Sequence, residues 1–289
     1  MKILCFGKHG LLSQELIKWL PQLEPEALCF LAHAECDITD ETQVAQAFKR
    51  FKPTHVINAA AYTQVDNCES NASMAHMVNG HALKHIAQSC MQYNAILLHF
   101  STDYVFNGRQ ESPYSETDAP MPISVYGQSK HLGETIIQKH LIQYYICRIQ
   151  WVFGPAKGNF ITAILDAATK QPELRVINDQ MGTPTSTTTI AKAVVNLFHN
   201  QPAFGLYHFR SLNHTTWYDY AQFVLNEWGI NTPIHPVSSF DYGAKAKRPQ
   251  NGVMNISKWI YSDLYTPPSW KNDVIDYLKT LKEAPNALR

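Results

Sequence analysis

The segment that decides the fold reads KILCFGKHGLLS and covers residues 2–13. It begins with a short apolar run, Lys2 to Phe6, which is typical of a buried strand. Gly7 and Gly10 follow, and the next apolar residues take helical spacing. Glycines at such a turn let a pyrophosphate approach the helix N-terminus, where free N–H groups and the dipole favour negative charge. Ser13 replaces the usual third glycine and is small enough to keep helix and strand close.

The alternation of strand and helix continues through the first half of the chain. The expected strands cover residues 27–31, 56–58, 96–101 and 144–148, and the expected helices cover 11–20, 74–91, the segment from Asp40 as cap to Phe51, and the segment that carries Tyr126. This βαβ pattern predicts an α/β fold with a Rossmann-type, doubly wound parallel sheet covered on both faces. Ligands of such sheets bind beyond the carboxyl ends of the strands.

After Arg148, prolines and glycines divide the chain into shorter elements. We expect helices over 188–198, 217–228 and 273–281, and a strand over 205–209. Residues 1–150 are therefore expected to form mainly an NAD(P)-binding Rossmann domain. Residues 151–289 are expected to form mainly a smaller α/β substrate-binding domain, with the chain crossing between the two more than once.

Composition excludes several classes of partner. The 24 Lys and Arg residues balance 24 Asp and Glu residues, so no overall cationic field attracts nucleic acid or an anionic membrane. No stretch is long and apolar enough to span a bilayer, and the N-terminus enters a strand without the apolar core of a signal peptide. Six separated cysteines without a CxxC pair indicate a reducing compartment. We therefore expect a cytoplasmic protein.

Tyr126 and Lys130 are the candidate catalytic pair. If the segment after Ser124 is helical, both side chains lie on one face, one turn apart. A free phenol titrates at about pH 10, but a neighbouring cation favours the phenolate and brings the group toward its working range. The hydroxyl of Thr102 could complete the site. Taken alone, such a pair occurs by chance on many solvated helices, so its meaning depends on the rest of the chain.

The residues after the second expected strand bear on cofactor choice. An NAD-selective protein commonly places an acid there for the ribose hydroxyls, but Ala32, His33 and Ala34 offer none at the first step. Lys8 and His33 could accommodate a 2′-phosphate. The sequence therefore favours NADPH and leaves use of NADH open. Asp37, a little further on, could reach the adenine or could simply be a turn residue.

Several motifs together resemble the dTDP-4-dehydrorhamnose reductases, a family of extended short-chain dehydrogenases/reductases. Besides the glycine turn and the segment from Tyr126 to Lys130, the matching segments are residues 58–63, 101–106, 148–154, 159–160, 179–185 and 248–249. They follow the family's order and cover nearly the whole chain. The combination is therefore far more specific than the glycine turn alone.

The resemblance implies reduction of the 4-keto group of dTDP-4-dehydro-6-deoxy-L-mannose to dTDP-L-rhamnose, for cell-surface polysaccharide synthesis. Hydride would come from NADPH or NADH, Tyr126 would protonate the oxygen, Lys130 would hold the nicotinamide ribose and acidify Tyr126, and Thr102 would bind the carbonyl. The implied cofactor-binding residues are Gly7, Gly10, Leu11, Leu12, Asp37, Ile38, Ala61, Tyr62, Thr63, Phe100, Tyr126 and Lys130.

The resemblance also implies that Thr102, Asp103, Trp151 and Arg248 bind the dTDP-sugar, with Arg248 suited to its diphosphate. Two of these have simpler interpretations. Trp151 could be an indole of the core, and Arg248 could belong to a basic surface loop. Gln150 stands where the family commonly has Ser or Thr, and this departure leaves a related nucleotide-4-keto-6-deoxyhexose open as the substrate.

Three further alternatives follow from the family's relatives. Some hold a divalent ion at a dimer interface, and Glu15 matches one such position, but residues 186–189 offer no acid as its partner. We therefore expect no metal and leave a homodimer open. A non-catalytic dinucleotide-binding subunit, like the regulatory subunit of methionine adenosyltransferase, would not need Thr102, Tyr126 and Lys130. Epimerase or dehydratase chemistry would use an additional acid or base, for which Asp103 is placed.

Overall fold

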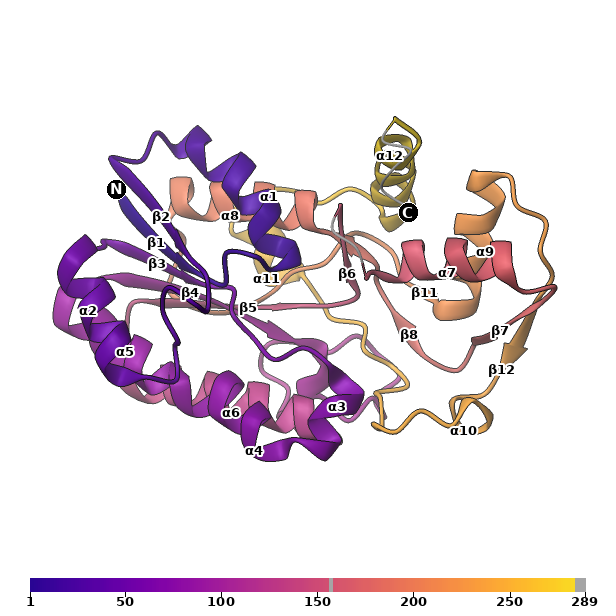
Figure 1. Cartoon of the computed structure of the whole chain (residues 1–289), viewed down its shortest axis with the longest axis horizontal. Helices are drawn as coiled ribbons and strands as arrows, with labels where there is room; N and C mark the ends of the chain where they lie inside the picture. Colours follow the sequence, from indigo (N-terminus) through magenta and orange to yellow (C-terminus); the bar gives the residue numbers. More distant parts are fainter. Residues whose placement is uncertain (156–157, 284–289) are drawn as a thin grey trace.

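A parallel sheet of six strands forms the centre of the larger half of the molecule (Figure 1). The computed structural model describes residues 1–155 and 158–283. The strands, in the spatial order β10-β5-β4-β3-β1-β2, are β1 (Lys2–Phe6), β2 (Ala27–Leu31), β3 (His55–Asn58), β4 (Ile96–Thr102), β5 (Tyr144–Ile149) and β10 (Gly205–His208). The strand order reverses between β1 and β3. This confirms the predicted doubly wound sheet, and the reversal creates a crevice at the carboxyl ends of these strands.

Helices cover both faces of the sheet, as predicted. One face carries α1 (Leu11–Trp19), α8 (Thr187–Asn200) and α11 (Ser257–Tyr261), and the other carries α2 (Glu41–Phe51), α5 (Ala82–Tyr93) and α6 (Val125–His140) (Figure 1). Asp40 caps α2 as expected, because its carboxylate accepts from the N–H groups of Thr42 and Gln43.

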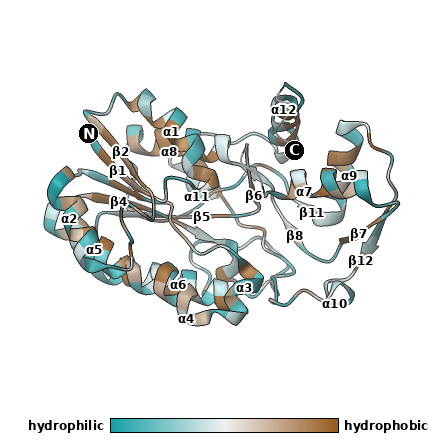
Figure 2. Ribbon diagram, in the orientation of Figure 1, coloured by the Kyte–Doolittle hydropathy of each residue, from teal (hydrophilic) through white to brown (hydrophobic). Residues whose placement is uncertain are grey.

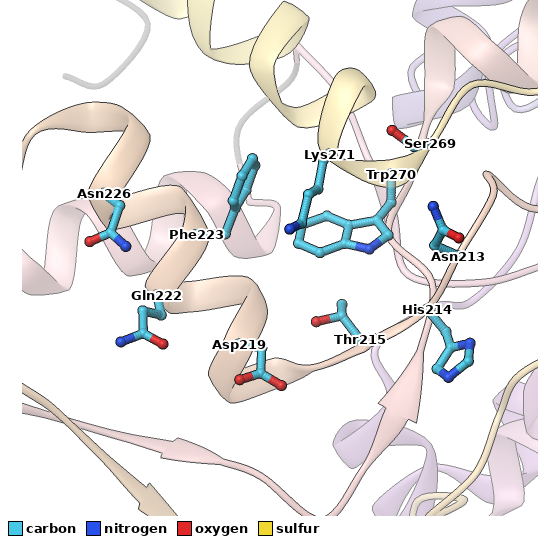
Figure 3. Close-up of a pocket in the computed structure, with 10 residues that line it drawn as sticks. All are labelled: Asn213, His214, Thr215, Asp219, Gln222, Phe223, Asn226, Ser269, Trp270 and Lys271. Carbon is cyan, nitrogen blue, oxygen red and sulfur yellow. The ribbon is translucent and has the colours of Figure 1, made fainter.

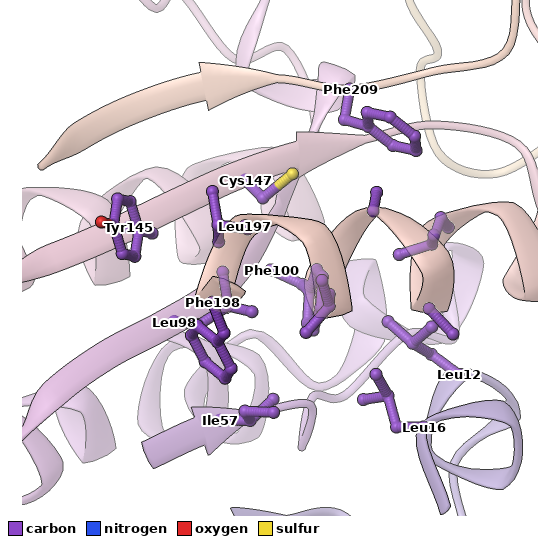
Figure 4. Close-up of a cluster of buried hydrophobic side chains, with 14 of the residues drawn as sticks. Leu12, Leu16, Ile57, Leu98, Phe100, Tyr145, Cys147, Leu197, Phe198 and Phe209 are labelled. Carbon is purple, nitrogen blue, oxygen red and sulfur yellow. The ribbon is translucent and has the colours of Figure 1, made fainter. Parts of the chain in front are cut away.

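Alternate side chains of each strand serve the two faces. Ile3 and Cys5 of β1 belong to the cluster under α1 and α8, whereas Leu4 and Phe6 belong to the cluster under α2 and α5. Figure 4 shows the first cluster, in which Leu12 and Leu16 of α1 and Leu197 and Phe198 of α8 meet the sheet. The sheet strands are largely brown in Figure 2, consistent with burial on both sides.

The helix expected over residues 74–91 is interrupted. α4 (Ala72–His76) and α5 are joined by a single π-helical turn, Met77–His81. The turn directs the buried Asn79 side chain at the loop after β3, where it accepts from the N–H of Tyr62 (2.8 Å) and donates to the carbonyl of Tyr62 (3.0 Å) and to Ser129 (3.0 Å). Hydrophobic periodicity cannot reveal such a turn, because it displaces the pattern by only one residue.

The second half of the chain contributes to both parts of the molecule. α8 and β10 return to the six-stranded sheet, which β10 joins beside β5. The remainder forms a smaller unit with its own core, built mainly from α7 (Phe160–Lys170), α9 (Trp217–Trp228), α12 (Trp270–Glu283), β7 (Leu174–Ile177) and β12 (Ile234–Val237). Short strand pairs connect the two units: β6 (Val152–Phe153) with β9 (Thr185–Ser186), and β8 (Met181–Gly182) with β11 (Thr215–Thr216). Within the described residues, none of the helices has the length and apolar character needed to cross a membrane.

A buried ion pair joins α6 to β5. Arg148 donates from Nε to Glu134 Oε1 (2.8 Å) and from Nη2 to Glu134 Oε2 (2.7 Å). Burial alone would raise the pKa of Glu134, but the hydrogen bonds and charge of Arg148 outweigh it and lower the pKa to about 2. The carboxylate therefore stays ionised inside the protein, where it compensates the guanidinium.

Replacing Glu134 by Ala should destabilise the fold severely, because Arg148 would stay buried without its partner. We expect Glu134→Ala to lower the free energy of unfolding by about 3–5 kcal/mol in urea denaturation. Asp166→Ala, which removes an exposed ion pair with Lys170 on α7, should cost less than about 1 kcal/mol. Equal losses in the two variants would contradict a structural role for the buried pair.

Candidate active site

A cleft of about 580 Å³ opens at the carboxyl ends of the central strands, between the two units. It brings together most of the residues that the sequence singled out, namely Gly10, Leu11, Leu12, Ala61, Thr63, Phe100, Thr102, Asp103, Tyr126, Lys130 and Trp151. Gly7, Asp37, Ile38, Tyr62 and Arg248 do not line this cleft, and their assignment to cofactor or substrate stays a prediction.

The glycine turn after β1 is shaped by close backbone packing. Gly7 has φ +93°, and a Cβ at this position would lie 2.7 Å from the nitrogen of Ala60. Gly7 thus brings the first turn against the end of β3 and does not itself reach the cleft. Gly10, which precedes α1 and lines the cleft, carries no side-chain cap, so the first N–H groups of α1 are left for a ligand.

The predicted catalytic residues come from two elements. Thr102 ends β4, whereas Tyr126 and Lys130 lie one turn apart on α6 and both line the cleft. Ser124 caps α6 by accepting from the N–H of Gly127 (3.2 Å). The helix therefore begins where the Tyr126–Lys130 pair requires it.

Tyr126 is more strongly protonated than its lysine neighbour suggested. Burial raises its pKa, and the nearby Asp103 and Tyr104 raise it further, although hydrogen bonding to Thr102 lowers it. The polar contacts of Lys130 are with β4, since its Nζ donates to the carbonyl of Phe100 (2.6 Å) and lies 3.2 Å from His99 Nε2. Burial therefore favours the protonated phenol, and the acidification of Tyr126 by Lys130 stays a prediction.

Asp103 is a buried carboxyl at the centre of the site. It accepts from the hydroxyl of Thr102 (3.1 Å), and it lies so close to Gly252 that a Cβ there would overlap its Oδ2. Burial raises its pKa to about 7. Near neutral pH this carboxyl can therefore be either a hydrogen-bond donor or an acceptor.

Trp151 lies at the border between the cleft and the smaller unit. It lines the cleft, and its indole stacks on that of Trp217 with ring centroids 3.6 Å apart. Its φ is +43°, in the left-handed region, and a Cβ at Gly182 would overlap its ring. The indole thus lies between the core of the smaller unit and the cleft.

Arg248 and Asp37 are already engaged within the protein. Arg248 donates to both carboxylate oxygens of Asp66 (3.2 and 2.7 Å) and lines a neighbouring cavity of about 600 Å³. Asp37 accepts from the N–H and the hydroxyl of Thr39, as a turn residue does, and Ile38 is buried in the core cluster beside α2. Tyr62 is held through its backbone by Asn79.

Two features of the site were not foreseen from the sequence. An acid does reach the end of β2: Glu35 folds back to accept from the N–H of Ala32 (2.8 Å) and pairs with Lys8 (3.7 Å). Gln150 lines the cleft and uses its amide on the backbone, donating to the carbonyl of Gly252 (2.7 Å) and accepting from the N–H of Thr183 (2.9 Å). The Glu35 contact is a local turn of three residues, whereas the Gln150 contacts depend on loops whose return path is invisible in sequence spacing.

A groove of about 570 Å³ between α9 and the start of α12 does not compete with the cleft as a candidate (Figure 3). Its lining includes exposed polar side chains such as His214, Asp219 and Lys271, and it contains none of the predicted site residues. The chemistry is therefore concentrated in the cleft at the strand ends.

The raised pKa of Asp103 has a consequence for stability. A carboxyl that titrates at about pH 7 when folded and at about 3.9 when unfolded contributes nothing below pH 4, and it destabilises the fold progressively up to pH 7. Asp103→Asn should therefore gain stability over the native protein between those pH values, at about 1.4 kcal/mol per pKa unit, and keep that gain at higher pH. Urea denaturation of the cofactor-free protein at several pH values measures the difference. If the free energies of unfolding of the two proteins change with pH in parallel, the raised pKa of Asp103 is contradicted. Asp166→Asn, which changes an exposed carboxylate, serves as control.

Comparison with known proteins agrees with this geometry. Residues 1–283 match the family described as RmlD substrate binding domain. The chain is 35% identical to the spore coat polysaccharide biosynthesis protein SpsK of Bacillus subtilis, over 98% of this chain and 99% of that protein. It is also 35% identical to the dTDP-4-dehydrorhamnose reductase of Shigella flexneri, over 97% and 98%.

Solved structures give the same result. The dTDP-4-dehydrorhamnose reductase of Bacillus anthracis in complex with NADP superposes with a TM-score of 0.93 at 28% identity, covering 97% of this chain and all of that one. The corresponding enzyme of Clostridium acetobutylicum gives a TM-score of 0.92 at 31% identity, covering 98% and 100%. The chain therefore belongs to the RmlD substrate binding domain family, that of the dTDP-4-dehydrorhamnose reductases.

Proposed function

We propose that this protein is an NADPH-dependent reductase that converts dTDP-4-dehydro-6-deoxy-L-mannose into dTDP-L-rhamnose for cell-surface polysaccharide synthesis. The observation that carries the proposal is the presence of Thr102, Tyr126 and Lys130 in one cleft at the carboxyl ends of the sheet. Relatives at 35% and 34% identity carry the same reductase name. A non-catalytic dinucleotide-binding subunit would have no need for this trio.

The cleft fits a nicotinamide dinucleotide. Small residues, Gly10 and residues 59–61, line the side next to the uncapped start of α1, which leaves space and free N–H groups for a pyrophosphate. Lys8 and the exposed His33 lie beyond β2, where a 2′-phosphate would be bound, but Glu35 pairs with Lys8 and suits ribose hydroxyls. We therefore propose NADPH, with NADH also accepted. When bound, the cofactor supplies the hydride.

The residues of the chain supply the proton and the orientation. Burial keeps Tyr126 protonated, so that it can donate to the substrate oxygen as negative charge develops there. The Thr102 hydroxyl lies beside it and is positioned to hydrogen-bond the same oxygen. Lys130, buried one turn away, would hold the nicotinamide ribose, and Asp103 and Trp151 would contact the sugar.

The nucleotide would extend into the neighbouring cavity, which shares Trp217 with the cleft. Its lining is largely apolar and includes Phe160, Val176 and Arg248. A diphosphate contact by Arg248 requires the guanidinium to give up or share its ion pair with Asp66. We thus retain residues 1–150 as mainly cofactor-binding and 151–289 as mainly substrate-binding, with the chain crossing between them.

Location and assembly are further proposals. The cytoplasm is supported by six free cysteines, five of them buried. A homodimer remains a proposal, as does the absence of an interface metal. Glu15, the residue at the family's metal position, bonds Lys18 (2.5 Å) and Thr188 (3.0 Å) of its own chain.

The direct test is cofactor oxidation. Purified protein with NADPH and dTDP-4-dehydro-6-deoxy-L-mannose is expected to consume NADPH and form dTDP-L-rhamnose, both of which are measurable. If NADPH is consumed only with another nucleotide-4-keto-6-deoxyhexose, the proposed substrate is wrong and the proposed type of reaction is right. Binding of NADPH without turnover of any such sugar would contradict the reductase and favour the binding subunit.

The role of Tyr126 has its own test. Tyr126→Phe should lower kcat by about 10²–10⁴-fold, the usual worth of a positioned acid, while NADPH still binds. Tyr145→Phe is the matched control, because it removes a phenol that donates to the carbonyl of Pro202 at the other end of the sheet. An unchanged rate in Tyr126→Phe would exclude the residue as the proton donor.

A further inference from the structure

Three buried side chains form a continuous polar chain behind the cleft. Asn58 of β3 and His99 of β4 are paired in the strand register, and Asn58 Nδ2 lies 3.1 Å from His99 Nδ1. On the other side of the ring, His99 Nε2 lies 3.2 Å from Lys130 Nζ. All three residues are at most 2% exposed.

The backbone fixes the direction of this chain. The N–H of Ala60 donates to Asn58 Oδ1 (3.2 Å), so the amide oxygen faces Ala60 and the NH₂ group faces His99. An amide NH₂ only donates, and His99 Nδ1 must therefore be the acceptor. The proton of a neutral ring is then on Nε2, where it points at Lys130.

An ammonium group has no lone pair and cannot accept that proton, whereas a neutral amine can. We infer that Asn58 and His99 are positioning residues for Lys130: Asn58 holds His99 as the Nε2–H tautomer, and this N–H favours the neutral amine of Lys130 in the cofactor-free site. The orientation of the Asn58 amide, the tautomer of His99 and the charge of Lys130 are thereby linked. Protonating Lys130 requires His99 to change tautomer and the side-chain amide of Asn58 to flip.

Burial around Lys130 and His99 also favours their neutral forms. Burial lowers the pKa of Lys130 to about 8, and burial followed by the charge of Lys130 lowers the pKa of His99 well below its ordinary value. Glu134 acts in the opposite sense, but Arg148 holds both of its oxygens. The groups that interact with Lys130 are His99 on β4 and Glu134 on α6. Glu134 in turn faces His131, Arg148 and His208, and Tyr126, on the same helix, faces Asp103.

The linkage bears on the proposed reduction, and this part of the inference rests on the proposed function. When Tyr126 gives its proton to the product oxygen, a phenolate remains, and an ammonium beside it favours that step. The upper pH limit of kcat then follows the titration of Lys130, whose pKa burial lowers to about 8, and the Asn58 and His99 pair lowers this limit further by favouring the amine. An isolated lysine would set it near pH 10.4.

The tautomer can be tested without turnover. In the cofactor-free protein at pH 9, above the pKa of Lys130, ¹⁵N NMR of the imidazole rings should show His99 neutral and protonated at Nε2, and the proton should move to Nδ1 as the pH falls below about 8. The signals of this ring are identified among the 13 histidines as those missing from His99→Gln. A ring protonated at Nδ1 at pH 9, or an imidazolium, would overturn the inference and leave the reductase proposal intact.

A variant of Asn58 distinguishes a positioning role toward Lys130 from a merely structural role. Asn58→Leu frees the tautomer without adding charge and should move the alkaline limit of kcat upward by about half to one pH unit. His55→Phe is the control. It changes a different buried histidine, on β3, that packs on Phe198, and it should leave the alkaline limit of kcat in place. A loss of kcat that is uniform with pH in Asn58→Leu would contradict the positioning role. Absence of turnover in the native protein would count against the proposed function, and the NMR result would still decide the inference.

Discussion

The ion pair between Glu134 and Arg148 fixes the helix on which the proposed chemistry depends. Glu134 lies one turn beyond Lys130 on α6, and Arg148 is paired in register with Ser101, just before Thr102. The guanidinium therefore holds the helix with Tyr126 and Lys130 against β5, and the backbone ladder between β5 and β4 connects it to the strand that ends in Thr102. The two parallel hydrogen bonds between Arg148 and Glu134 fix the angle as well as the distance between β5 and α6.

The pair also organises the loop between β4 and α6. Arg148 Nη1 donates to His208 Nε2 (3.3 Å), so His208 must donate from Nδ1 to the carbonyl of Tyr114 (3.1 Å), and Glu116 accepts from the N–H of His208 (2.9 Å). Tyr114 stacks on Phe106, with ring centroids 4.1 Å apart. The loop is thus packed into the protein at its middle.

The sequence predicted what depends on periodicity and local chemistry. The strands, the cap at Asp40 and the helical face shared by Tyr126 and Lys130 follow from apolar spacing and short-range hydrogen bonding. It failed where a side chain bonds a group that lies near it only in the fold. Gln150 joins two distant loops, and Arg248 is paired with Asp66, 182 residues earlier in the chain. Such partners have no local signature, because their spacing depends on how the loops return.

Burial is the common cause of the electrostatic state of the site. It is the largest influence on the raised pKa values of Asp103 and Tyr126 and on the lowered pKa of Lys130, and in each case it favours the neutral form. The buried charge pair of Glu134 with Arg148 is internally compensated. A keto oxygen in this cleft would therefore meet neutral donors. Charge would develop only as hydride arrives, and in a buried site the donors would then interact with it more strongly than they would in water.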